Sequence, residues 1–108
     1  MASPLNTFKS IAANITTIPN YIYTCPPDTT AIVLLAQATN VNANIDGNVT
    51  FFSNINNNTE LVKNLIIPVQ DAISLLTGKL VVETGKSIGA YANSNNVIKI
   101  TLSILETK

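Results

Sequence analysis

The chain has 108 residues, of which 46% are hydrophobic and 11% are charged, and its six basic and six acidic residues cancel. This length is enough for one domain with one core. A neutral chain without arginine lacks the cationic charge that nucleic acids and anionic membranes attract, so we expect neither as a partner.

The N-terminal segment, residues 1–15, is predicted to be an arm that becomes ordered on assembly, although residues 7–17 have a weak strand pattern. Residues 16–108 are predicted to form a single domain. The first ten residues, MASPLNTFKS, contain no basic region followed by an apolar run, so they do not resemble a signal peptide. The sequence also lacks an apolar stretch of about 18 residues, and we therefore expect no transmembrane helix and synthesis in a cytoplasm.

Two predicted strands flank a turn that is rich in proline. NYIYT, residues 20–24, is a short strand with Tyr21 and Tyr23 on the same face. CPPDT, residues 25–29, predicts a turn because prolines interrupt strand pairing. The β-branched, largely apolar run at residues 30–41 predicts a long strand, either covered on both faces or central in an assembly.

The middle of the chain alternates between strands and turns rich in asparagine. Asp46 and Gly47 predict a hairpin turn after the long strand. Residues 48–55 form the predicted return strand, and the three asparagines at 56–58 form the next turn. Residues 59–67 form a further predicted strand, which ends at a proline.

Shorter elements follow a predicted corner at residues 68–71. Residues 72–77 fit either a short strand or a helical turn, whereas residues 79–83 and 86–92 are predicted strands. NSNN, residues 93–96, predicts the last turn.

The final strand, residues 97–105, has the clearest pattern. Alternate apolar residues place four side chains on one face: Ile98, Ile100, Leu102 and Ile104. With it, the chain has about eight short strands separated by turns every 8–12 residues or so. This spacing predicts an all-β fold, an antiparallel two-sheet β-sandwich of jelly-roll or immunoglobulin-like topology.

One stretch ends like a phosphate-binding loop. In GKLVVETGKS, residues 78–87, six residues separate Gly78 from Gly85, whereas the loop requires four, and no helix pattern follows. We therefore predict a tight hairpin turn in which Gly85 supplies the backbone conformation.

The sequence offers no catalytic, cofactor or metal residues. Without histidine there is no triad of the usual kind and no His-based metal site. Cys25, the only cysteine, is predicted to be a small buried residue. A calcium loop at residues 42–47 would have a single charged ligand, Asp46, which is too little charge for a divalent cation. We expect a protein that is not an enzyme and that has no cofactor.

Aromatic side chains have two interpretations. Packing is the commoner role in a sandwich, and the three phenylalanines are candidates to fill the core: Phe8, Phe51 and Phe52. As a minority alternative, three tyrosines could line a sugar-binding face: Tyr21, Tyr23 and Tyr91.

Two stretches together resemble a known group of proteins. YIYTCPPDTTAIVLLAQATNV, residues 21–41, resembles the opening Y-T-x-P-x-x-T-T-x-I-x-L of small β-sandwich structural proteins of tailed bacteriophages. Residues 61–92 resemble their stretch I-P-x-x-D-A-x-x-L-L-x-G-K-L-V-L-E-x-G-D-x-I. The chain departs from this pattern at Lys86, where aspartate is commoner, and in the loop at 42–58. The matching positions of the second stretch are Ile67, Pro68, Asp71, Ala72, Leu75, Leu76, Gly78, Lys79, Leu80, Val81, Glu83, Gly85 and Ile88.

The resemblance implies a virion structural protein, foremost a capsid decoration or cement protein that stabilises the shell through multivalent contacts. Its partners would be the major capsid protein or other virion proteins and its own copies, in a homo-oligomer such as a trimer. A neck, tail or fibre-attachment protein is the first alternative, and a host-surface glycan-binding module is the second. The candidate interface residues are Phe8, Ile11, Asn42, Asn44, Asn56, Asn57, Asn95 and Leu105.

Overall fold

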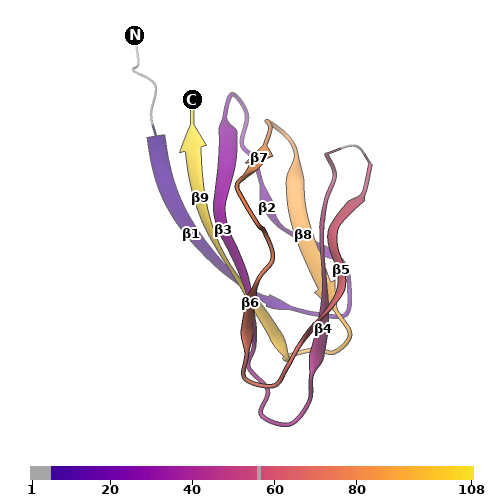
Figure 1. Ribbon diagram of the computed structural model, residues 1–108. Helices are drawn as coiled ribbons and strands as arrows, with labels where there is room; N and C mark the ends of the chain where they lie inside the picture. The colour runs from indigo at the N-terminus through magenta and orange to yellow at the C-terminus, as the bar shows by residue number, and fades with distance from the viewer. Residues whose placement is uncertain (1–5, 56) are drawn as a thin grey trace.

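The computed structural model describes residues 6–55 and 57–108, which form two antiparallel sheets packed face to face (Figure 1). The strands are β1 (Asn6–Ile15), β2 (Asn20–Thr24), β3 (Thr30–Asn40), β4 (Gly47–Ser53), β5 (Thr59–Ile67), β6 (Ala72–Ser74), β7 (Leu80–Val82), β8 (Ser87–Ala92) and β9 (Ile98–Thr107). Sheet A has the order β1-β9-β3-β6, and β7 also pairs with β3; sheet B has the order β2-β8-β4-β5. The predicted β-sandwich is confirmed.

Most connections between consecutive strands cross from one sheet to the other. Among the described strands, only β4–β5 and β6–β7 follow one another within a sheet. The hairpin predicted at Asp46 and Gly47 is therefore wrong, because the chain passes there from β3 in sheet A to β4 in sheet B. Residues 72–74 resolve the ambiguity at 72–77 in favour of a short strand.

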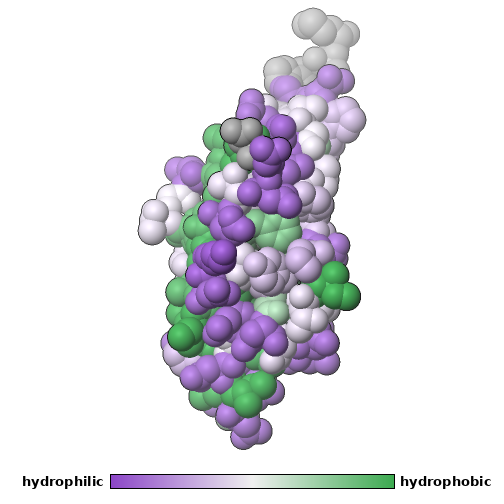
Figure 2. All heavy atoms as spheres, turned by 90° about the vertical axis from the view of Figure 1, so that its right-hand side faces the viewer, coloured by the Kyte–Doolittle hydropathy of each residue, from purple (hydrophilic) through white to green (hydrophobic). Residues whose placement is uncertain are grey.

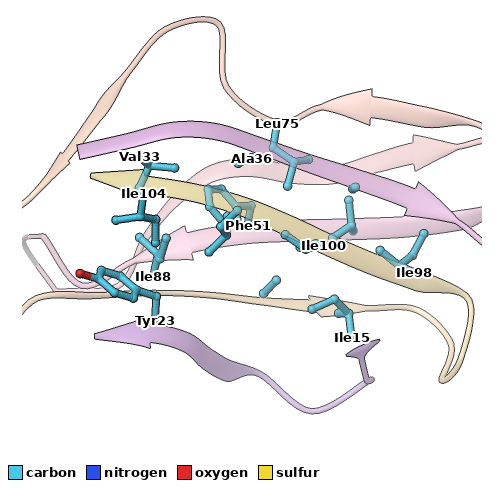
Figure 3. Packing of buried hydrophobic residues seen from close by; sticks show 14 of the residues in the cluster. Ile15, Tyr23, Val33, Ala36, Phe51, Leu75, Ile88, Ile98, Ile100 and Ile104 are labelled. Atoms are coloured by element: carbon cyan, nitrogen blue, oxygen red, sulfur yellow. The ribbon is translucent and has the colours of Figure 1, made fainter. Parts of the chain in front are cut away.

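The core lies between the sheets and is built around β9. As predicted, Ile98, Ile100, Leu102 and Ile104 are fully or almost fully buried, while the residues between them face outward. From sheet B, Phe51 and Ile88 meet this row (Figure 3). Because β9 pairs with β1 on one side and β3 on the other, its side chains hold the middle of sheet A against sheet B.

The long strand β3 occupies the centre of sheet A. Its predicted place at the centre of an assembly stays a prediction. β9 pairs along one edge, and β6 and β7 pair with successive parts of the other edge. Coverage on both faces is not observed in the single chain, because Leu34 and Leu35 are exposed at a bulge in the pairing with β9.

The N-terminal segment departs from the predicted arm. Residues 6–15 are strand β1 of sheet A and pair with β9 in an unbroken register from Asn6 opposite Thr107 to Ile15 opposite Ile98. This segment therefore belongs to the sandwich in the single chain, and the weak strand pattern at 7–17 was the better guide. Residues 1–5 of the predicted arm lie outside the described residues.

The two tyrosines of β2 lie on opposite faces of sheet B, which corrects the prediction that they share one. The pairing with β8 shifts register between Tyr21 and Tyr23. Such a bulge inserts one extra residue and reverses the alternation of side chains beyond it. Tyr23 consequently enters the core, whereas Tyr21 remains on the outer face.

The predicted turn at Gly85 exists, but it connects the two sheets and is not a hairpin within one sheet. Gly85 has φ 78°, and the N–H of Lys86 donates to the carbonyl of Glu83 at 2.9 Å. The turn packs against the proline turn at 25–29, since the N–H of Gly85 donates to the carbonyl of Cys25 at 3.1 Å. Among the described residues, four others in the connections have positive φ: Asp28, Asn57, Gln70 and Asn96.

A polar cluster around the buried residues Tyr23 and Glu106 joins the sheets near the free ends of β1 and β9. The hydroxyl of Tyr23 donates to Glu106 Oε2 at 2.5 Å, and Lys9 Nζ lies 3.1 Å from the other carboxylate oxygen. The hydrogen bond from Tyr23 is the main cause that lowers the pKa of Glu106; burial opposes the shift, and Lys9 adds to it. For Tyr23, by contrast, burial is the main cause of a raised pKa.

Glu106 should make stability depend on pH. Because its pKa is lower in the folded chain than in the unfolded chain, its contribution is complete above the ordinary glutamate pKa of about 4.3 and is lost as the pH falls through the folded value. Glu106→Gln should reduce the free energy of unfolding at pH 7 by about 1.5–3 kcal/mol. The difference from the native chain should shrink at pH 3.

Urea denaturation at both pH values measures this effect. Glu83→Gln, at the exposed turn before β8, controls for the loss of one negative charge. If Glu106→Gln lowers the free energy of unfolding by the same amount at pH 7 and at pH 3, the charge of this carboxylate does not contribute to stability.

Gly89 of β8 allows its two neighbouring strands to approach closely. A Cβ at this position would lie 2.3 Å from the backbone oxygen of Asn20 in β2 and 2.9 Å from the ring of Phe52 in β4. Backbone cannot move aside as a flexible side chain can, so the β2–β8 pairing depends on glycine here.

Gly89→Ala should therefore destabilise the fold by about 1–3 kcal/mol through overpacking. Gly78→Ala is the matched control, because a Cβ at Gly78 meets no atom within 4 Å. We expect that variant to stay within about 0.5 kcal/mol of the native chain. Thermal or urea denaturation of the two variants measures this difference in stability. Equal stabilities would refute a close approach of backbones at Gly89.

Candidate functional site

The described residues contain no group of three or more histidine, cysteine, aspartate or glutamate side chains that could hold a metal ion. Cys25 is buried, as predicted, and its thiol lies 3.2 Å from the carbonyl of Thr29. Burial raises the pKa of this thiol, which favours the unreactive protonated form. Among the residues that the structure describes, no helix is long and apolar enough to cross a membrane. The remaining candidates are binding surfaces on the outer faces of the two sheets.

An apolar row crosses the outer face of sheet A, and we call it the sheet A row. Phe8 in β1 lies opposite Leu105 in β9, Leu105 lies opposite Ile32 in β3, and Ile32 lies opposite Val81 in β7. Residues directly opposite in neighbouring strands share a face, so these four side chains are adjacent. Phe8 is 74% exposed and Val81 is 53% exposed, and the exposed pair Leu34 and Leu35 lies close by on β3.

The structure thus brings together two of the predicted interface residues, Phe8 and Leu105, although they are almost a whole chain length apart in sequence. A third, Ile11, is partly buried against the core, because it lies opposite Leu102 on the inner face of sheet A. Phe8 was also a candidate for the core, and that prediction is wrong.

The predicted asparagine contacts lie at both ends of the molecule (Figure 1). Asn42 and Asn44 belong to the β3–β4 connection, where the side chain of Asn42 accepts hydrogen bonds from the N–H groups of Asn44 and Ile45. Asn95, in the β8–β9 connection, accepts a hydrogen bond from the N–H of Thr17. Asn57 lies at the opposite end, in the β4–β5 turn. Asn56 lies outside the described residues.

A hollow on the outer face of sheet B has a volume of about 330 Å³, and we call it the sheet B hollow. Pairing aligns Tyr21 in β2, Gly89 in β8, Phe52 in β4 and Glu60 in β5 across the sheet. Because Gly89 has no side chain, the surface is recessed at its position, and the ring of Phe52 lies over its backbone. The described residues of the lining are three aromatic residues, Tyr21, Phe52 and Tyr91, and four others, Pro19, Asn20, Asn58 and Glu60.

The three aromatic rings form a concave cluster. The ring centroids of Tyr21 and Phe52 are 5.6 Å apart with the planes at 56°, and those of Phe52 and Tyr91 are 6.2 Å apart at 44°. Phe52 is largely covered by the two tyrosines, whereas Tyr21 is 44% exposed. Tilted contacts of this kind hold the rings in place while one edge of the cluster remains accessible.

Polar groups border this cluster. The Tyr21 hydroxyl donates to Asn58 Oδ1 at 3.2 Å, which fixes the tyrosine beside the β4–β5 turn. Within the described part of the chain, the Asn58 amide nitrogen, the Glu60 carboxylate and the Tyr91 hydroxyl have no hydrogen bond to protein. They are free to contact a ligand.

Of the three tyrosines proposed for a sugar-binding face, Tyr21 and Tyr91 lie in the sheet B hollow and Tyr23 does not. Sequence reasoning missed Phe52, which was assigned to the core, and Glu60. Strict alternation from the buried Phe51 would have placed Phe52 on the outer face. No local signal identifies Glu60, whose position depends on the pairing of β4 with β5.

Elsewhere the surface is mixed. The side of the molecule nearest β5, which faces the viewer in Figure 2, combines extended hydrophilic regions with smaller hydrophobic groups. Ile66 of β5 is an example of an exposed apolar side chain outside both candidate surfaces, with 57% of its area accessible. Isolated residues of this kind are normal on protein surfaces, whereas a row across four strands is not.

Comparison with known proteins identifies the fold and nothing more specific. No protein-family model matches the chain, and no curated protein matches it. Among solved structures, a chain of Bacillus endospore appendages, which form a novel family of disulfide-linked pili, is similar with a TM-score of 0.53 and 10% sequence identity. The match covers 97% of this chain and 87% of that chain. At this identity the similarity concerns the arrangement of the strands.

Proposed function

We propose that the chain is a structural component of a tailed-phage virion, foremost a capsid decoration or cement protein. The proposal begins from the resemblance of residues 21–41 and 61–92 to small β-sandwich virion proteins. Its partners would be the major capsid protein or other virion proteins, together with copies of itself in a homo-oligomer such as a trimer.

The sheet A row is the observation that carries this proposal. An exposed apolar patch spanning several strands is costly in water and marks a surface that another protein covers. Because strand pairing fixes the positions of the residues in the row, the row is a preformed surface suited to a rigid partner. A neutral surface with few charges also adds little repulsion between neighbouring copies on a particle.

Weak contacts would suffice for such a role. One copy would bury only the row and its surroundings, but an assembly of linked copies binds through several rows at once and dissociates far more slowly. In this mechanism the protein reinforces a shell by bridging its subunits and performs no chemical reaction.

A neck, tail or fibre-attachment protein is the second candidate, and the fold similarity to a pilus subunit gives it some support, since both would be repeating parts of an elongated structure. The appendages are described as disulfide-linked pili. The same linkage does not suit this chain, because its single cysteine is buried where the turn at 25–29 meets the turn at 83–86. Copies would therefore associate through noncovalent contacts.

Fractionation of virions tests the proposal. Particles of the phage that encodes the chain would be separated into heads and tails and probed with antibodies against the purified chain. Detection on heads supports the decoration role, and detection on tails alone moves the protein to the neck or tail. Absence from both fractions refutes a virion role.

Phe8→Ser tests the sheet A row. Because Phe8 is exposed, the variant should fold with native stability, but it should bind isolated heads at least about tenfold more weakly in co-sedimentation. Ile66→Ser is the matched control, an exposed apolar side chain on β5 in the opposite sheet. Weakened binding of the Ile66→Ser variant, with native binding of the Phe8→Ser variant, would place the contact on sheet B instead.

A further inference from the structure

We propose that the sheet B hollow is a binding site for a neutral saccharide. The site is on the face opposite the sheet A row, and it does not depend on where the chain sits in a particle. Its chemistry comes from three features: exposed aromatic ring surface, uncharged polar groups beside it, and one carboxylate.

The aromatic part of the hollow suits the apolar face of a sugar ring. A pyranose exposes several C–H groups on one face, and these groups are attracted to the electron-rich face of an aromatic ring. Tyr21 offers such a face, because 44% of it is accessible, and Phe52 and Tyr91 support it from beneath and beside. The volume of about 330 Å³ accommodates one or two sugar rings.

The polar border supplies both kinds of hydrogen-bonding partner that a sugar hydroxyl needs. The Glu60 carboxylate only accepts hydrogen bonds, the Asn58 amide nitrogen only donates them, and the Tyr91 hydroxyl does both. None of the three has a hydrogen bond to another group of the described chain. Asn58 is also held in place, since its oxygen accepts the hydrogen bond from Tyr21.

The charge of the hollow disfavours an anionic ligand. Among the lining residues that the structure describes, Glu60 is the only charged one, and no lysine lies there. An acidic sugar, a phosphate or a single-stranded nucleic acid would meet a negative charge without a compensating cation.

A proline-rich peptide is the main competitor, because aromatic grooves also bind polyproline helices. Such a segment presents backbone carbonyls and few N–H groups, so it could accept a hydrogen bond from Asn58 but could donate little to Glu60. A saccharide satisfies both groups. The position of a carboxylate beside the rings therefore favours the sugar.

The test is saturation-transfer NMR of the full chain with a fixed set of probes at about 5 mM, since a shallow site of this size should bind with a dissociation constant on the order of 1 mM. The neutral probes are tetrasaccharides of β-1,4-glucose, α-1,4-glucose and β-1,4-N-acetylglucosamine. A tetragalacturonate represents acidic sugars, and a decaproline peptide represents the competitor. We expect transfer to the ring C–H protons of at least one neutral tetrasaccharide and none to tetragalacturonate.

Three variants locate the site. Tyr21→Ala should weaken binding by about tenfold or more, because it removes the exposed stacking face. Glu60→Gln should weaken it severalfold while leaving the rings in place. Phe8→Ala is the matched control: it removes an exposed aromatic side chain from the opposite face and should leave binding unchanged.

Several outcomes would overturn the inference. No transfer to any neutral tetrasaccharide, or transfer to decaproline alone, would rule out a neutral saccharide as the ligand. Sugar binding that survives both Tyr21→Ala and Glu60→Gln would place the site elsewhere. Circular dichroism of each variant confirms that a loss of binding is not a loss of fold.

Discussion

Burial of alternate side chains along β9 determines the rest of the architecture. Ile98, Ile100, Leu102 and Ile104 point into the sandwich and are covered by sheet B, and truncation of a side chain in such a position typically costs about 2–5 kcal/mol. Since β9 pairs with both β1 and β3, its register fixes which residues of those strands face the interior and which face the solvent. The outward positions of Phe8, Leu105 and Ile32 in the sheet A row follow from this alternation, and that of Val81 follows from the pairing of β7 with β3.

The outer face of sheet B depends on a different constraint, the close approach of backbones at Gly89. β2 and β4 lie on either side of this residue and place the aromatic residues Tyr21 and Phe52 opposite it, and the Phe52 ring reaches the space where a side chain would stand. A bulge in β2 turns Tyr21 outward while Tyr23 joins the sheets from the inside through Glu106. The bulge in β2 thus provides both an aromatic residue on the surface, Tyr21, and a buried hydrogen bond between the sheets, from Tyr23 to Glu106.

The strands and turns could be predicted from sequence because their signals are local. Alternation marked β9, and proline, glycine and asparagine marked the breaks between strands. The faces of Tyr21 and Tyr23 could not be predicted, because nothing in the pentapeptide NYIYT reveals a bulge. Strand partners were equally hidden: at Gly47 a sequence typical of a hairpin instead leads to the other sheet, where Gly47 lies close to Ile98 of β9. Both candidate surfaces arise from pairing between distant segments, so the sequence predicted some of their residues, such as Phe8 and Leu105 or Tyr21 and Tyr91, but not which residues lie next to one another.

The two surfaces look in opposite directions, because each lies on the outer face of its own sheet. A copy attached through sheet A necessarily turns sheet B toward the surrounding fluid. If many copies coat one particle, their hollows form a regular array whose spacing is set by the lattice of that particle. A ligand chain long enough to reach neighbouring hollows would then adhere to the coat even though each single hollow releases it quickly. Attachment through sheet A would therefore orient all the sheet B hollows outward, and together they would hold a long ligand that a single hollow releases quickly.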